Sequence, residues 1–114
     1  MSLEIVQTSN FKAEVKRLSK RYRSFDDDLL TFLLELKANP TQGVEVAPHI
    51  RKVRMTIHSK GKGKSGGARV ITCTALVGEK DGVLGLITIY DKSDASNVKM
   101  NVILEMVKEL GLLG

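Results

Sequence analysis

Residues 68 to 90, ARVITCTALVGEKDGVLGLITIY, decide the fold. Two runs rich in β-branched and apolar residues, Ala68 to Val77 and Val83 to Tyr90, stand on either side of Glu79-Lys80-Asp81-Gly82. Such runs are typical of strands that are covered on both faces, and Asp-Gly supplies the positive dihedral angles of a tight hairpin. The stretch therefore predicts two antiparallel strands at the centre of a sheet.

The segment before this stretch predicts a further strand. Apolar residues at positions 53, 55 and 57 alternate with polar ones, namely Lys52, Arg54, Thr56 and His58. Alternation with a period of two indicates one face in the core and one charged face. Leu3 to Gln7 is a candidate fourth strand at the N-terminus, and we expect Thr41 to Pro48 to be a connecting loop.

Along the chain, helices are expected both before and after these strands. Phe11 to Tyr22 has apolar residues in steps of four, three and four after a possible cap at Thr8, Ser9 or Asn10. Ser24 is expected to cap a second helix that Asn39-Pro40 ends, and a last helix should run from near Ser96 to Gly111. The predicted class is α+β: an antiparallel sheet of three to four strands with an N-terminal helical hairpin and a C-terminal helix.

Size and composition limit the possible classes of protein. The chain has 114 residues, 42% of them hydrophobic and 27% charged, which predicts one globular domain over residues 1–114. No apolar run approaches the roughly 20 residues of a membrane span, and no secretory signal is evident, so we expect a cytoplasmic protein without membrane contact. Cys73, His49 and His58 are too few soft ligands for structural zinc. We expect neither a metal nor a cofactor.

Positive charge is concentrated in one part of the chain. The formal net charge is +5, yet no Asp or Glu occurs between Glu45 and Glu79. That window contains seven basic residues, namely Arg51, Lys52, Arg54, Lys60, Lys62, Lys64 and Arg69. A concentrated positive field attracts polyanions, above all nucleic acid.

Gly63-Lys64-Ser65 superficially suggests a nucleotide-phosphate loop. The G-x-x-x-x-G-K-[ST] pattern would require glycine at position 58, where His58 stands, and would lead into a helix rather than into the strand that starts at Ala68. We interpret the segment as the glycine-rich end of a hairpin between the strand of Arg54 and the strand of Arg69. Its lysines are then available to a phosphodiester backbone.

Two segments of the chain, together with the order of its elements, resemble a known family. The order of elements, the segment G-K-G-K-S-G-G-A-R-V-I at 61–71 and the segment I-Y-D-K-S at 89–93 resemble the RelE/ParE superfamily of type II toxins, nearest its HigB-like branch. The resemblance covers residues 11 to 110. It implies a toxin that cleaves mRNA on the ribosome and that a cognate antitoxin neutralises, as a monomer or weak dimer when the antitoxin is absent.

The resemblance also implies site residues. The expected catalytic residues are Arg69, Lys64, Lys92, Lys62, Tyr90 and Arg54. Those expected to bind nucleic acid are Arg51, Lys52, His58, Lys60, Lys62 and Lys64. Some members of the family have a catalytic tyrosine early in the last helix, whereas Asn97 to Met100 contains none.

Cleavage by the 2′-hydroxyl needs a proton acceptor, neutralisation of the growing phosphorane charge and protonation of the leaving 5′-oxygen. A guanidinium held on a strand suits the second task, and Arg69 is the first choice. Crowded like charges favour a neutral amine, which makes one of Lys60, Lys62 and Lys64 a candidate base, with His58 as the alternative.

Two other functions remain open at the level of sequence. One is a catalytically weakened module of the same fold that binds RNA or only its antitoxin. The other is a ParE-like gyrase inhibitor, in which the basic loop would contact protein.

Overall fold

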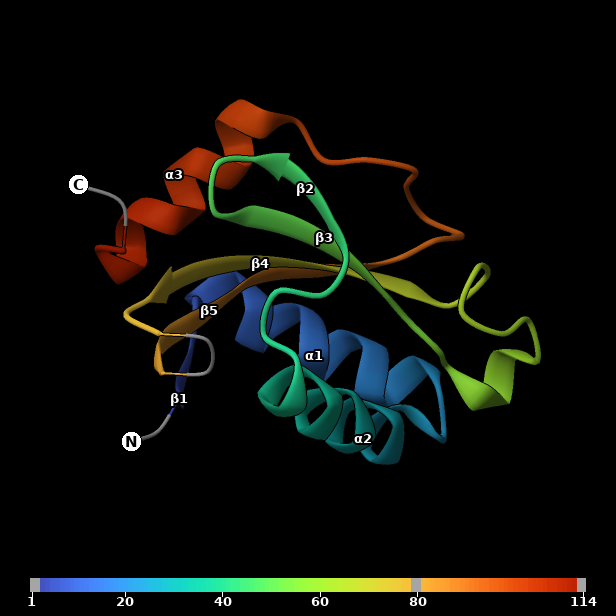
Figure 1. Ribbon diagram of the computed structural model, residues 1–114. Coiled ribbons are helices and arrows are strands. Elements are labelled where there is room, and N and C mark those ends of the chain that lie inside the picture. The colour runs from blue at the N-terminus through green and yellow to red at the C-terminus, as the bar shows by residue number, and fades with distance from the viewer. Residues whose placement is uncertain (1–2, 79–80, 113–114) are drawn as a thin grey trace.

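The computed structural model describes residues 3–78 and 81–112 (Figure 1). The chain begins with a strand and two helices, continues through four strands and ends in a helix. In order, the elements are β1 (Leu3–Gln7), α1 (Ser9–Arg21), α2 (Phe25–Ala38), β2 (Val44–Ala47), β3 (Ile50–Met55), the short 3-10 helix η1 (His58–Lys60), β4 (Ala68–Leu76), β5 (Gly82–Asp91) and α3 (Met100–Leu110).

The sheet differs from the predicted one. It has five strands in the order β1-β5-β4-β3-β2, and it is mixed, because β1 runs parallel to β5 while the other pairs are antiparallel. The prediction of three to four antiparallel strands was therefore wrong. Short hairpin turns revealed the antiparallel pairs, but nothing local indicates that the N-terminal strand pairs with a strand nearly 80 residues later.

The fifth strand lies in the segment that we expected to be a loop. β2 has only four residues, VEVA, and forms a hairpin with β3 in which Glu45 lies opposite Arg51. His49 in the connection has a φ of 68°, a conformation uncommon for residues other than glycine. A strand this short, between Gly43 and Pro48, has too little alternation to be recognised from sequence.

The helices agree with the sequence at some ends and not at others. Thr8 caps α1, since its hydroxyl accepts a 2.9 Å hydrogen bond from the Phe11 amide. Ser24 precedes α2 but makes no capping bond of this kind; its hydroxyl donates to the Asp28 carboxylate at 2.6 Å. α3 begins at Met100 rather than near Ser96, and it ends at Gly111, which has a φ of 65°.

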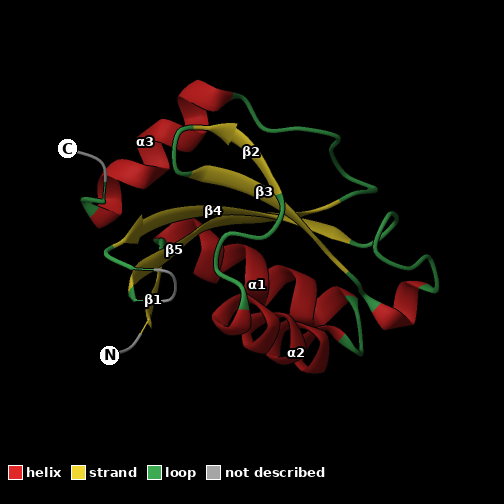
Figure 2. Cartoon of the chain, viewed as in Figure 1, coloured by secondary structure: helices red, strands yellow, loops and turns green. Residues whose placement is uncertain are grey.

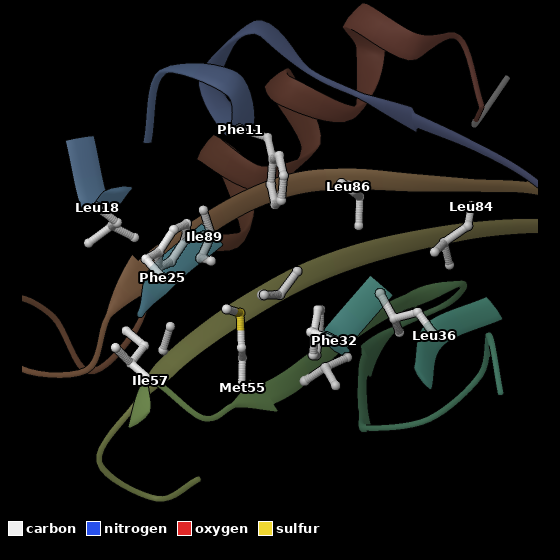
Figure 3. Close-up of a cluster of buried hydrophobic side chains, with 13 residues drawn as sticks. Phe11, Leu18, Phe25, Phe32, Leu36, Met55, Ile57, Leu84, Leu86 and Ile89 are labelled. Atoms are coloured by element: carbon white, nitrogen blue, oxygen red, sulfur yellow. The ribbon is translucent and has the colours of Figure 1, made fainter. Parts of the chain in front are cut away.

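The sheet separates two hydrophobic clusters. α1 and α2 cover one face, where Phe11, Leu18 and Phe32 pack against Met55 and other strand residues (Figure 3). α3 covers part of the other face, over a smaller cluster that includes Ile71 and Tyr90. Figure 2 shows these three layers, and it also shows that the long loop before α3 and the loop after η1 reach well beyond the helices.

The central strands occupy nearly the predicted ranges. β4 and β5 pair along their length, and the predicted hairpin between the strands of Arg54 and Arg69 is confirmed by the antiparallel register of β3 and β4. Of the expected turn between β4 and β5, Glu79 and Lys80 lie outside the described residues. In the part of the chain that the structure describes, no helix is both long enough and apolar enough to cross a membrane.

Candidate nucleic-acid interface

Three predicted site residues lie side by side across the three central antiparallel strands. Arg54 of β3 is directly opposite Arg69 of β4, which is directly opposite Tyr90 of β5. Directly opposed residues project from the same face of a sheet, and two like charges in that position destabilise the strand pair. An arrangement that costs stability in this way is expected where function requires it.

These residues project away from α1 and α2. Val53 and Val70, the neighbours of Arg54 and Arg69 along the strands, pack in the core cluster under the two helices. Because side chains alternate between faces, Arg54 and Arg69 belong to the opposite face, which α3 covers only in part. The part that α3 leaves open is available to a ligand.

A hollow of about 640 Å³ lies on this open part of the sheet. Among the described residues it is lined by five cationic side chains and by no carboxylate; the five are Lys52, Arg54, Lys64, Arg69 and Lys92. Its other lining residues are Gln42, Gly43, Val44, Val46, Val53 and Ser96. We call these five cations and the space between them the basic hollow. It brings together residues from β3, β4, the loop before β4 and the loop after β5.

Most cations of the basic hollow are free of carboxylate partners. Arg54, Lys64 and Lys92 are exposed, and within residues 3–78 and 81–112 they take part in none of the ion pairs. Lys52 is half-buried, and its Nζ donates to Asn97 Oδ1 at 3.3 Å. Unpaired cations around one concavity raise the local concentration of anions.

Arg69 is placed differently from the other four. Its side chain is 6% exposed, and its guanidinium binds the loop that carries Lys64. Nη1 donates to the carbonyl oxygens of Lys64 (3.1 Å) and Ala68 (3.2 Å), and Nη2 donates to that of Ser65 (3.0 Å). Arg69 thus forms the floor of the basic hollow and holds the loop, which leaves it fewer N–H groups for a phosphate than we predicted.

The glycines of the loop have two separate roles. Gly61 and Gly63 have positive φ values of 70° and 63° with open space around them, so they serve the turn. At Gly67 a Cβ would lie 2.1 Å from the Met55 carbonyl oxygen, and the Lys92 amide donates to the Gly67 carbonyl at 3.0 Å. Gly67 is therefore required by the close approach of neighbouring backbone and not by a ligand.

His58 and Lys60 lie outside the basic hollow and have partners of their own. The His58 ring Nδ1 pairs with Asp28, whose other carboxylate oxygen accepts from the His58 amide at 2.8 Å. Burial acts to raise the pKa of Asp28, but hydrogen bonds from Ser24 and His58 outweigh it and lower that pKa. His58 thus fastens η1 to the start of α2.

Lys60 belongs to a buried charge cluster around Asp91. Its Nζ donates to Asp91 Oδ1 at 2.5 Å and to the Ser93 hydroxyl at 2.8 Å, and the side chains of Lys60 and Asp91 are 5% and 0% exposed. Arg21 and the Tyr22 hydroxyl bind the other Asp91 oxygen. Burial acts to raise the pKa of Asp91, but these hydrogen bonds hold it well below its ordinary value.

The remaining predicted site residues also lie apart from the basic hollow. Tyr90 is 7% exposed, and its hydroxyl has no hydrogen-bond partner within the described residues. Burial raises the pKa of Tyr90, although the nearby Arg69 opposes this. Arg51 alternates to the other sheet face and donates to the Thr74 hydroxyl at 3.0 Å, and Lys62 is exposed on the loop without lining the hollow.

Sequence reasoning missed the two acids that bind His58 and Lys60 and so keep them out of the basic hollow. Asp28 and Asp91 lie outside the basic window, so counting charges along the chain could not connect them with His58 and Lys60. The one available signal was Asp91 itself, an acid at the end of a strand that is otherwise nearly all apolar. Among residues 3–78 and 81–112, His, Cys, Asp and Glu side chains form no group of three that could hold a metal ion.

No protein-family model matches the chain. The case for a function therefore rests on the geometry and charge of the basic hollow, and on the resemblance of the segments 61–71 and 89–93.

Proposed function

We propose that the protein is an endoribonuclease that cleaves mRNA on the ribosome, as the toxin of a type II toxin-antitoxin system in the cytoplasm. The basic hollow carries this proposal. Four of the six residues expected to be catalytic, Arg54, Lys64, Arg69 and Lys92, line one concavity together with Lys52. Its volume of about 640 Å³ is within the range of small-molecule sites and leaves room for a phosphodiester with part of its nucleosides.

In the proposed reaction the 2′-oxygen bonds to phosphorus and the bond from phosphorus to the 5′-oxygen breaks. The products are a 2′,3′-cyclic phosphate and a 5′-hydroxyl, so no water and no oxidant is consumed. Arg54 and the lysines of the basic hollow that take no part in proton transfer contact the non-bridging oxygens and stabilise the charge that grows on them. Arg69 adds positive charge from below while it fixes the Lys64 loop.

In this proposal, lysine amines of the basic hollow transfer the protons. Arginine keeps its proton in proteins, His58 is bound to Asp28, and Lys60 is bound to Asp91. The acceptor of the 2′-proton is therefore an amine among Lys52, Lys64 and Lys92, and a second amine supplies the proton for the 5′-oxygen. Lys64 is the first choice because its loop is held in place by Arg69.

The matched variants Lys64→Ala and Lys62→Ala test the proposal. Both remove one exposed lysine from the same loop, but only Lys64 lines the basic hollow. We expect Lys64→Ala to slow cleavage of mRNA on translating ribosomes by about 10² to 10³, which is within the usual contribution of one general acid or base. Lys62→Ala should cut at nearly the wild-type rate, with 5′-hydroxyl ends on the products. Equal losses in the two variants, or no scission by the wild type, would contradict the proposal.

A second candidate function is favoured because several groups that could transfer a proton are bound to acids or buried. With His58 and Lys60 bound to acids and the Tyr90 hydroxyl buried, the protein is also suited to grip RNA, or an acidic segment of an antitoxin, without cutting. This module would bind single-stranded RNA with a salt slope of about 0.7 per phosphate contact. Retention of RNA without new ends after long incubation would identify it.

A further inference from the structure

α1 carries a second basic surface, on its side turned away from the core. The helix buries Phe11 and Leu18 against the sheet, and Glu14 is the only acid among its 13 residues. Five basic side chains are exposed on it: Lys12, Lys16, Arg17, Lys20 and Arg21. None of them lines the basic hollow.

These five side chains divide into a fixed pair and a free row. Arg17 and Arg21 are held by Glu14, Asp91 and Asp94. The ion pairs among residues 3–78 and 81–112 do not include the other three, Lys12, Lys16 and Lys20, which follow one another in steps of four and so share one side of the helix. We call these three residues the lysine ridge.

A shallow groove of about 450 Å³ runs beside the ridge and is lined only by residues of α1. Its small residue is Ala13, and its other lining residues are Lys16, Arg17, Lys20 and Arg21. Four of its five lining residues are basic, and the two arginines among them are paired with acids. A ligand here would therefore meet the free charge of Lys16 and Lys20 on a shallow surface.

The composition of this surface selects one class of partner. A protein interface is depleted of lysine and needs an apolar or aromatic core, and none is exposed here. A helix that binds membranes places apolar residues beside the basic ones for insertion, but Phe11 and Leu18 are already buried in the core. A polyanion with regularly spaced charges requires only exposed cations, which makes a nucleic-acid backbone the fitting partner.

The lysine ridge and the basic hollow face opposite ways. α1 packs on the sheet face that contains Val53 and Val70, whereas Arg54 and Arg69 project from the other face (Figure 1). One short strand of RNA therefore does not reach both. The concave hollow suits a single strand, while the convex ridge suits the phosphates of a duplex, which proteins contact with little reading of sequence.

We propose that the lysine ridge binds the phosphate backbone of duplex RNA, independently of the basic hollow. The proposal rests on the proposed function only in its choice of RNA. It gives the protein two RNA contacts: one that presents a single strand to the hollow and one that holds a base-paired region of the same or a neighbouring RNA.

A charge-matched pair of variants tests the ridge with a blunt-ended RNA duplex as the probe. Lys16→Gln with Lys20→Gln removes two ridge lysines, whereas Lys37→Gln with Lys108→Gln removes the same charge from exposed positions of α2 and α3. We expect the ridge variant to bind the duplex at least about fivefold more weakly, with a salt slope lower by about 2, since each lost phosphate contact lowers it by about 1. The control variant should keep the wild-type slope.

Lys64→Ala separates this inference from the proposed function. It should lose cleavage but keep duplex binding, because Lys64 belongs to the hollow. A wild-type protein that binds duplex through the ridge without cutting any message would support the ridge and contradict the endonuclease. Wild-type affinity and slope in the ridge variant, equal weakening in the control, or no duplex binding at low salt would overturn the ridge.

Discussion

The base and the tip of the loop between β3 and β4 contain lysines with opposite surroundings. Lys60, at the base, is 5% exposed and donates to buried Asp91, while Lys64, near the tip, is exposed and lines the basic hollow without a carboxylate partner. The two residues are four positions apart in one glycine-rich run. The difference teaches that acids distant in sequence decide which cations of a basic run hold the fold and which can meet a ligand.

The largest effect that this comparison predicts is on stability. Lys60→Met leaves Asp91 buried with one cation fewer, and removing one partner of a buried ion pair costs about 3 kcal/mol or more. The matched variant Lys62→Met changes an exposed lysine that makes no ion pair within the described residues, and should stay within about 0.5 kcal/mol of wild type. Urea denaturation measures both free energies of unfolding. Similar values for the two variants would show that the Asp91 cluster does not hold the loop.

The next effect concerns the arginine beneath the loop. Arg69→Lys keeps the charge but cannot hold three carbonyl oxygens in the fork that the guanidinium provides, so we expect a loss of about 2 kcal/mol. Trypsin should then cut after Lys62 or Lys64 faster than in the wild type. Arg54→Lys is the control, because Arg54 is exposed and makes no hydrogen bond to the loop within the described residues. A loop as protected in Arg69→Lys as in Arg54→Lys would remove the anchoring role.

A smaller effect comes from acid. The pKa values of Asp28 and Asp91 are lower in the folded state than the ordinary carboxyl value near 4, so the unfolded chain binds more protons as the pH falls. Their contribution to stability is therefore present above about pH 5 and is lost as the pH falls toward the folded values. Chemical denaturation at a series of pH values between about 6 and about 3 should show falling stability, with a shallower fall in Asp28→Asn.

Asp27→Asn is the control for this dependence, since it removes one negative charge from an exposed position of the same helical turn. It tests whether losing one negative charge from this turn is enough by itself to make the fall in stability shallower. An equal slope in wild type and Asp28→Asn would show that the bonds from Ser24 and His58 do not stabilise the Asp28 carboxylate.

The sequence predicts those features of the fold that depend on residues close together in the chain. The strands around Arg69 and Tyr90 follow from their own composition, and the alternation around Val53 places Arg54 on the charged face. The hairpin between these strands then brings Arg54 opposite Arg69, so most of the basic hollow could be predicted. Lys92, another of its five cations, could be placed there because it comes directly after β5.

What the sequence does not predict depends on contacts between distant residues. The parallel pairing of Leu3 with Gly82 and the bond from Lys60 to Asp91 each join positions that no local pattern connects. The burial of Arg69 was also missed. A charged residue at the start of a strand is expected to be exposed unless the loop that covers it is known. The bond to Asp91 and the burial of Arg69 divide the basic run into cations that hold the fold and cations that are available to a ligand.

The smallest predicted effect is that of removing the Tyr90 hydroxyl. This group is buried, lies outside the basic hollow and has no hydrogen-bond partner within the described residues. Burial also raises the pKa of Tyr90, so the phenol keeps its proton near neutral pH and is unsuited to act as a base. Tyr90→Phe should leave stability unchanged or higher by up to about 1 kcal/mol and alter cleavage by less than about threefold.

Tyr22→Phe is the matched control because it removes the same atom from a tyrosine whose hydroxyl donates to Asp91. It should destabilise the fold by about 2 kcal/mol, since a hydrogen bond to a buried charge is lost. Thermal unfolding and the cleavage assay together separate the two tyrosines. A Tyr90→Phe protein that is fully stable yet cleaves about 10² times more slowly would mean that the phenol reaches the scissile phosphate after all, and that α3 has to move aside during the reaction.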